Sequence, residues 1–396
     1  MLERLLLGFW IFLFWTQVHS LTFLRPLKLG MGILALALCL VIIRYGVLGI
    51  NPMQRRLLLF AGLCLANLST PILTSIANEN NLSDLMHPSY WSWVKIMLVS
   101  ALLPLVFTEW RSKSLMFWNG VGIACALGTV LYFAWASDEL LNGRLHTSYS
   151  KFGDANALAT VIGSVLPFLF FSFGQSTRFQ KLLIIGFFVI LSSILIMSKS
   201  RMGIASAFVS SLFYLYSCYN GKKSLVVLGF SVFIAIVASL ILIFDSSFFD
   251  RFTTLTDGSA LNRFQSWQLG FHLLLENPLF GVGVDGAKSQ FYELGYPSPL
   301  ITYSKQLQVH NLWLQITADL GFVGLLVFSA LIFLVLAEIK KNRKYDRAFY
   351  YSSVASFLCL MLNSLTIPML YLEFWVFLMA VLFTINSRQR AAYHFH

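Results

Sequence analysis

Long apolar runs, each about 20 residues long and separated by short charged joints, recur along most of this 396-residue chain. Hydrophobic residues make up 58% of the sequence and charged residues 11%, and the mean hydropathy is +0.74. A soluble domain of this length needs far more polar surface, whereas continuous apolar runs of this length are typical of transmembrane helices. A porin-type barrel is excluded, because its strands would alternate apolar and polar residues. The sequence therefore predicts an all-α, polytopic membrane protein.

We predict about twelve transmembrane helices from the apolar runs. Their approximate ranges are 5–20, 29–46, 57–76, 91–109, 116–136, 155–174, 182–198, 203–219, 224–244, 311–337, 349–367 and 369–386. The first run ends in Val18-His19-Ser20, which resembles a signal-peptidase site, and we favour an uncleaved anchor. The whole chain, 1–396, then forms a single integral membrane domain with one long polar loop at 245–310.

The basic residues indicate how this domain is oriented. With the N-terminus in the cytoplasm, the inner joints hold 17 of the 28 Lys and Arg residues, including the run from Lys340 to Arg347. Short loops rich in Lys and Arg stay on the cytoplasmic side, so the loop at 245–310 faces away from the cytoplasm. The same distribution explains the net charge of +11 as membrane anchoring, and no nucleic-acid partner is expected.

The long loop contains sequence signals for ordered structure. Residues 263–275 (RFQSWQLGFHLLL) have helical apolar spacing, and Asn277-Pro278 ends the run. We expect an amphipathic helix here, lying over the membrane face. The glycine-rich segment 281–286 (GVGVDG) follows a helix and a proline rather than a strand, so it predicts a tight turn and not a nucleotide site.

Three segments on the predicted outer side carry candidate site residues. They are Ser198-Lys199-Ser200-Arg201 between two spans, Asn262-Arg263-Phe264 in the loop, and Val309-His310-Asn311-Leu312 where the loop re-enters the membrane. We expect Arg201, Arg263 and His310 to converge above an apolar cavity. Taken singly, each has a structural interpretation: Lys199 and Arg201 as snorkelling groups, Arg263 as a loop charge, and His310 as a residue bonded to backbone. All five cysteines fall in apolar runs without metal-type spacing, so neither a disulfide framework nor a metal site is predicted.

The spacing after the histidine resembles a known family. His310-Asn311, nine residues, and then Gly321-Phe322-Val323-Gly324 match the H[NSQ]-x9-GxxG pattern of bacterial O-antigen ligases. Four further segments are similar to that family: GDANALATVIGSVLP (153–167), SKSRMGIASA, NRFQSWQLGFHLLLENPLFGVGVDGA and VHNLWLQITADLGFVGLL. The resemblance covers the chain from about residue 150 onward. It departs at Asp319, where relatives often have Glu.

The resemblance implies a glycosyltransferase of the bacterial inner (plasma) membrane with its active site facing the periplasm. Its donor would be a glycan on undecaprenyl diphosphate, and its acceptor a sugar hydroxyl of lipid A–core. Arg201 and Arg263 would take the positions of the family's diphosphate-contacting arginines, with Lys199 beside them, and His310 that of its essential histidine. Asn311, Gly321 and Gly324 complete the motif, and we expect a structural role in close helix packing for the two glycines.

Residue chemistry agrees with this expectation. The sequence has no DxD motif to hold a divalent metal, whereas guanidinium groups can stabilise a diphosphate leaving group by charge-assisted hydrogen bonds. Histidine is suited to deprotonating a hydroxyl at neutral pH. We therefore expect a metal-independent, inverting displacement with no cofactor.

Two alternatives stay open from the sequence. One is an O-antigen or exopolysaccharide polymerase of the same superfamily, whose acceptor is another lipid-linked glycan. The other is a transporter of lipid-linked glycans, which would place ionisable groups near the membrane centre rather than at one face. Nothing in the sequence demands more than a monomer.

Overall fold

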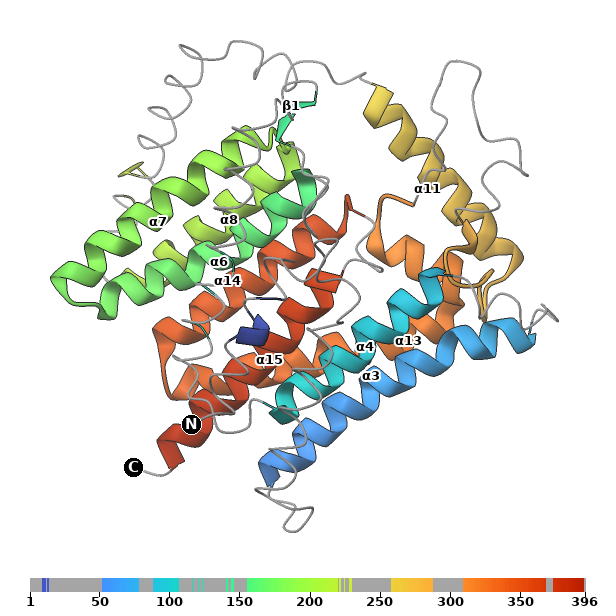
Figure 1. Ribbon diagram of the computed structural model, residues 1–396, viewed down its shortest axis with the longest axis horizontal. Helices are drawn as coiled ribbons and strands as arrows, with labels where there is room; N and C mark the ends of the chain where they lie inside the picture. The colour runs from blue at the N-terminus through green and yellow to red at the C-terminus, as the bar shows by residue number, and fades with distance from the viewer. Residues whose placement is uncertain are drawn as a thin grey trace.

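The computed structural model describes residues 52–77, 88–106, 155–219, 258–287, 309–367 and 373–394, with isolated positions between 9 and 145 and between 221 and 229. The main helices are α3 (Pro52–Ala77), α4 (Pro88–Val106), α6 (Ala155–Gln175), α7 (Arg178–Met197), α8 (Arg201–Cys218), α11 (Gly258–Glu276), α13 (Leu312–Lys341), α14 (Arg347–Ser364) and α15 (Glu373–His394). A 3-10 turn, η4 (Asn342–Lys344), joins α13 to α14, and the two-residue strands β1 (Leu140–Leu141) and β2 (Arg144–Leu145) pair antiparallel. The described residues are therefore almost entirely helical, which confirms the predicted class (Figure 1).

Four of the described helices are long and apolar enough to cross a membrane. The four stretches are Leu58–Ile76, Ala155–Gln175, Arg178–Met197 and Leu312–Lys344. Helices α8 and α14 coincide with the predicted spans 203–219 and 349–367 but are rich in serine, and they are not among the four. Of the other predicted spans, 29–46 and most of 5–20, 116–136 and 224–244 lie outside the described residues. The total of about twelve spans thus stays a prediction.

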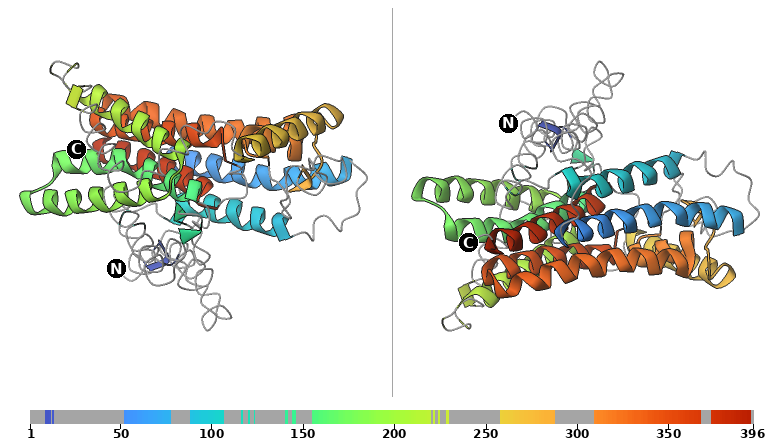
Figure 2. Two further views of the ribbon diagram at one scale, coloured as in Figure 1. Left: turned by 90° about the horizontal axis from the view of Figure 1, so that it is seen from above. Right: turned by 90° about the horizontal axis from the view of Figure 1, so that it is seen from below.

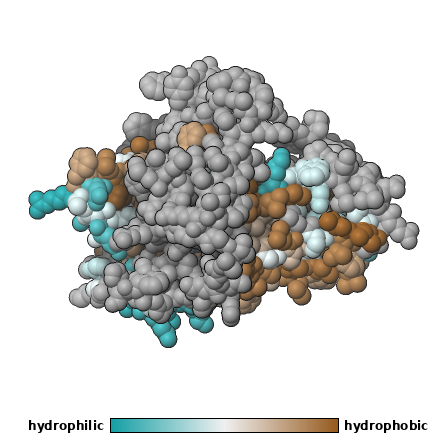
Figure 3. Space-filling model, turned by 60° about the horizontal axis from the view of Figure 1, so that its bottom comes forward, coloured by the Kyte–Doolittle hydropathy of each residue, from teal (hydrophilic) through white to brown (hydrophobic). Residues whose placement is uncertain are grey.

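Helix α7 shows how such a span meets its surroundings. Its large apolar side chains, such as Phe179, Leu182 and Val189, are exposed along most of its length. A helix of this composition that leaves its apolar side chains uncovered is stable in lipid but not in water. In Figure 3, a further broad area of hydrophobic residues lies on the right of the molecule, on the side opposite to α7 in Figure 1.

Helices α6, α8 and α14 form a closely packed group. A Cβ at Gly203 of α8 would clash with Ala159 of α6, and a Cβ at Gly163 would lie 2.7 Å from the Sγ atom of Cys359 on α14. Small residues at such positions let helix backbones approach closely where no water drives their association. Asn363 of α14 adds a hydrogen bond from its side-chain amide to the hydroxyl of Ser206.

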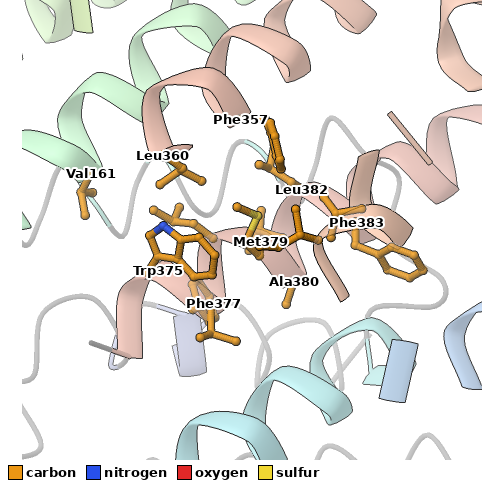
Figure 4. Close-up of a cluster of buried hydrophobic side chains, with 14 of the residues drawn as sticks. Val161, Phe357, Leu360, Trp375, Phe377, Met379, Ala380, Leu382 and Phe383 are labelled. Carbon is orange, nitrogen blue, oxygen red and sulfur yellow. The ribbon is translucent and has the colours of Figure 1, made fainter. Parts of the chain in front are cut away.

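Aromatic stacking holds the other helices together around α15. Trp375 stacks on Phe328 of α13 with ring centroids 5.4 Å apart, and Phe383 stacks on Phe60 of α3 at 4.4 Å. Figure 4 shows Trp375 and Phe383 among the buried apolar side chains of this region. Most of the helices run close to a common direction, whereas α11 crosses that direction at one end of the bundle (Figures 1 and 2).

A kink in α13 receives the segment that follows α11. Gly321 interrupts the helix with φ 66° and ψ −168°, a conformation that favours glycine. The backbone N–H groups of Val282 and Gly283 donate to the carbonyls of Ala318 and Asp319 at 2.9 and 2.8 Å. On the other side of the kink, the N–H of Phe322 donates to the carbonyl of Pro278 at 2.9 Å.

These contacts test two expectations about glycine. Gly281 and Gly283 have positive φ values, and the N–H of Gly286 donates to the carbonyl of Gly283, so the segment is a tight turn as predicted. A side chain at Gly321 would clash with the backbone of Leu279, so this glycine allows close approach to the loop rather than to a neighbouring span. Gly324 faces Leu320 of its own helix.

Substitution of Gly321 by alanine is expected to destabilise the protein by about 2 kcal/mol or more, because the new Cβ meets a strained backbone and the Leu279 carbonyl. Thermal unfolding in detergent would show a melting temperature lowered by several degrees. The matched control is Gly186→Ala on α7, where no atom lies within 4 Å of the added Cβ and stability should be unchanged or slightly higher. Equal melting temperatures for the two variants would contradict this account of the kink.

Candidate functional site

The turn between α7 and α8 carries the first pair of predicted site residues, Lys199 and Arg201. Lys199 has a φ of 48°, which is uncommon for a residue with a side chain. Ser200 caps α8 by accepting from the N–H of Gly203, and its hydroxyl donates to the side-chain oxygen of Asn156 at 2.8 Å. Arg201 is therefore the first residue of α8, half-buried, beside the N-terminal end of α6.

A single hydroxyl group connects the other two predicted residues, Arg263 and His310. Ser266, which is fully buried, donates to the carbonyl of Arg263 at 2.8 Å and accepts from the N–H of His310 at 3.4 Å. The indole of Trp267 donates to the carbonyl of His310 at 3.1 Å. Both backbone groups of His310 are thus held by α11, one turn beyond Arg263.

The end of α14 connects this pair to α8. Asn363 donates to Ser206, in the second turn of α8 after Arg201. The next residue, Ser364, accepts from the indole of Trp313 at 3.2 Å, and Trp313 lies three residues after His310. A path of hydrogen bonds and short helical steps therefore runs from the turn at Lys199 to Arg263. All three predicted segments lie at one end of the helix bundle.

The electrostatics of this end favour anions. Helices α8 and α13 both begin here, and each helix N-terminus carries a partial positive charge from its aligned peptide dipoles. Lys199, Arg201 and Arg263 add three cationic side chains in the same region. The N-terminus of α6 lies here too, and the C-termini of α7 and α14 offset most of the dipole field. The three cationic side chains are therefore the main source of positive charge at this end of the bundle.

The predicted motif residues of α13 have structural contacts. The side-chain oxygen of Asn311 caps α13 by accepting from the N–H groups of Trp313 and Leu314, which fixes the helix start next to His310. Asp319, fully buried, accepts from the N–H of Ala287 at 3.1 Å. Asp319 thereby holds the segment after α11. It makes this contact at the position where the family that the sequence resembles often has the longer side chain of glutamate.

Several residues of this region were not predicted from the sequence, namely Asn156, Ser266, Trp267, Trp313, Asn363 and Ser364. Their partners lie far away in the chain, so no local pattern marks them. Only Ser266 could have been expected near the site from the sequence, because it follows Arg263 by one helical turn. Among the described residues, no three His, Cys, Asp or Glu side chains lie together in a way that could hold a metal ion.

The fold and this end of the bundle define a helical membrane protein with a basic, histidine-containing region at one surface. Comparison with known proteins gives a family match for part of the chain. Residues 186–329 match the model of the family described as O-antigen ligase. The matched range contains Lys199, Arg201, Arg263, His310, Asn311, Gly321 and Gly324. The predicted resemblance to the O-antigen ligase superfamily is therefore confirmed for this part of the chain.

A curated relative points the same way. A protein of Rickettsia conorii, named as a provisional polysaccharide ligase, is 31% identical over 103 residues. The aligned part covers 24% of this chain and 24% of the relative. The match thus spans about a quarter of the relative's length.

Replacing Ser266 with alanine should loosen the contact between α11 and the residues before α13. The change removes two hydrogen bonds at a fully buried position and should cost about 1–3 kcal/mol. Hydrogen exchange followed by mass spectrometry would show faster exchange in the peptide containing His310. Ser193→Ala is the matched control, since that exposed hydroxyl bonds to Val189 of its own helix. Unchanged exchange at His310 would show that Ser266 does not hold the two segments together.

Proposed function

We propose that the protein is an O-antigen ligase-like glycosyltransferase that moves a glycan from undecaprenyl diphosphate to a sugar hydroxyl of lipid A–core. The single observation that carries this proposal is the link through Ser266, which places the backbones of Arg263 and His310 side by side at the basic end of the bundle. The family match over 186–329 supports a ligase-like or polymerase-like role for this region. The apolar spans support a location in the membrane, and we assign it to the bacterial inner membrane with the site on the periplasmic side.

In the proposed reaction, an acceptor hydroxyl oxygen attacks the anomeric carbon of the donor glycan. The bond between that carbon and the diphosphate oxygen breaks, and its electron pair stays with the diphosphate. The hydroxyl proton passes to the imidazole of His310. One displacement of this kind inverts the anomeric configuration and needs no divalent metal or other cofactor.

Each charged residue has a distinct part in this scheme. Arg201 and Arg263 bind the diphosphate and stabilise the charge that develops on it, and Lys199 adds a third cation. A preorganised donor of this type typically contributes about 10²–10³-fold to the rate. The N-terminal ends of α8 and α13 contribute in the same sense, since diphosphate is an anion.

The choice between a ligase and a polymerase depends on the acceptor. The assay uses purified full-length protein in liposomes, a glycan on undecaprenyl diphosphate, and either lipid A–core or further lipid-linked glycan as acceptor. We expect the product to be glycan attached to lipid A–core, separated by gel electrophoresis. Elongated lipid-linked glycan without lipid A–core product would identify a polymerase instead. Movement of donor across the bilayer without either product would indicate transport.

His310→Ala is expected to reduce transfer about 10²–10⁴-fold, because the acceptor hydroxyl then lacks its base. The rate of product formation under saturating donor measures this effect.

The matched control for this prediction is His272→Ala. His272 lies on α11, half-exposed and 3.2 Å from the carboxylate of Glu276. Its replacement removes an imidazole from the helix that packs beside His310, at a position outside the proposed site. Its activity should stay close to that of the unchanged protein. Equal activity for the two variants would remove His310 from the reaction.

A further inference from the structure

An exposed apolar stripe runs along the side of α11 that faces away from the bundle. Leu269 and Leu273 on the packed side are fully buried against Leu314 and Ala318 of α13. On the opposite side, Phe264, Phe271 and Leu275 follow one another at i, i+7 and i+11, which places them on one helix face. The exposed Gln268 lies on the same face between Phe264 and Phe271, and further polar residues, including the pair His272 and Glu276, flank the stripe. Helix α11 thus has two apolar faces, and one of them is uncovered.

The stripe continues onto α13. Leu279, in the turn after α11, lies next to Phe322 because Phe322 and Val323 donate backbone hydrogen bonds to Pro278 and Leu279. From Phe322 the exposed apolar residues continue along α13 with Leu326 and Phe333. These seven side chains (Phe264, Phe271, Leu275, Leu279, Phe322, Leu326, Phe333) are between 51% and 80% exposed. The uncovered face of α11 is therefore continuous with the outer face of a membrane span.

The length of α13 gives the depth at which α11 lies. Helix α13 has 30 residues, about 45 Å at 1.5 Å per residue, which exceeds the roughly 30 Å of the hydrocarbon core. Its basic end at Lys340 and Lys341 marks one membrane surface. The kink at Gly321 is then about 30 Å away, at the opposite surface. Helix α11 packs on α13 just beyond this kink, at headgroup level, and runs across the direction of the spans (Figure 1).

From this continuity and depth, we propose that the stripe of Phe264, Phe271, Leu275 and Leu279 inserts into the lipid leaflet and anchors α11 in the membrane interface. The occupant of this face is the acyl and headgroup boundary of the bilayer. Helices of this kind lie in the interface plane with their apolar side in the acyl boundary and their polar side in water. Arg263 lies on α11, and His310 is bonded to α11 through Ser266. The anchor therefore fixes both residues at the height of lipid headgroups.

Nitroxide labels provide the test, with the full-length protein reconstituted in phospholipid vesicles and its five native cysteines replaced by alanine. Single cysteines at Phe271 and Leu275 carry the label. Glu276 serves as the matched control, because it is the exposed neighbour of Leu275 on the polar side of the same helix. Leu326 on α13 serves as the lipid-facing reference. Collision rates with oxygen and with a water-soluble nickel chelate are measured at each position.

Labels at 271 and 275 are expected to give an oxygen-to-nickel ratio several-fold above that at 276 and similar to that at 326. Nickel access equal to that at 276 would overturn the proposal by placing the stripe in water. Exclusion of both reagents would also overturn it, because another protein surface would then cover the stripe. These readouts do not involve glycan transfer, so they are independent of the proposed function.

A second measurement avoids substitutions. The unchanged protein is reconstituted with a phospholipid that carries a photoactivatable group near the glycerol, irradiated and digested. Lipid attached to the peptide containing residues 264–279 is expected, at a yield comparable to that of exposed peptides from α7. Labelling of α7 without labelling of 264–279 would overturn the proposal.

Discussion

The interruption of α13 at Gly321 is the constraint on which the rest of the site depends. A continuous helix would use the N–H groups of Phe322 and Val323 for its own bonds. At the kink, these N–H groups donate instead to the carbonyls of Pro278 and Leu279. The carbonyls of Ala318 and Asp319 accept from the N–H groups of Val282 and Gly283. Backbone groups buried without partners are costly, so this exchange of bonds fixes the loop at one position. The placement of α11 follows from that position, and the placement of Arg263 follows from α11.

Two groups of helices from different parts of the chain meet at this end of the bundle. Helices α6, α8 and α14 form one side, packed through small residues within the membrane part of the protein. Helix α11 and the start of α13 form the other side, packed through Leu269, Leu273 and Leu314. The indole of Trp313, bonded to Ser364, bridges the two sides. Residues more than 100 positions apart in the sequence, Lys199 and His310, are thereby held at the same level.

Much of the helical architecture could be predicted from apolar periodicity. The predicted run 155–174 and the observed helix α6 differ by one residue, and the predicted end at Asn277-Pro278 agrees with the end of α11 at Glu276. The start of α11 was predicted five residues too late, because Gly258 and Ser259 carry no apolar signal. The short pairing of β1 with β2 has no periodicity that could mark it.

The site was harder to predict than the helices. Arg201, Arg263 and His310 stood out through a family resemblance and through their charge at one predicted face. The residues that hold them, such as Ser266, Asn363 and Ser364, are ordinary in a membrane protein sequence. Their contacts join positions 44 to 157 residues apart, and such pairs are determined by tertiary packing rather than by local pattern.

The segment between Ala287 and Val309 leaves and re-enters the same buried cluster. Ala287 is fixed by Asp319, and Val309 packs beside Leu269 and Leu273, immediately before the bond from His310 to Ser266. Both ends are therefore anchored independently of the residues between them. Insertions, deletions or exchanges within this segment leave the spacing of Arg263 and His310 unchanged. Changes in the length or chemistry of this part of the chain are thus compatible with the same link between Arg263 and His310 through Ser266.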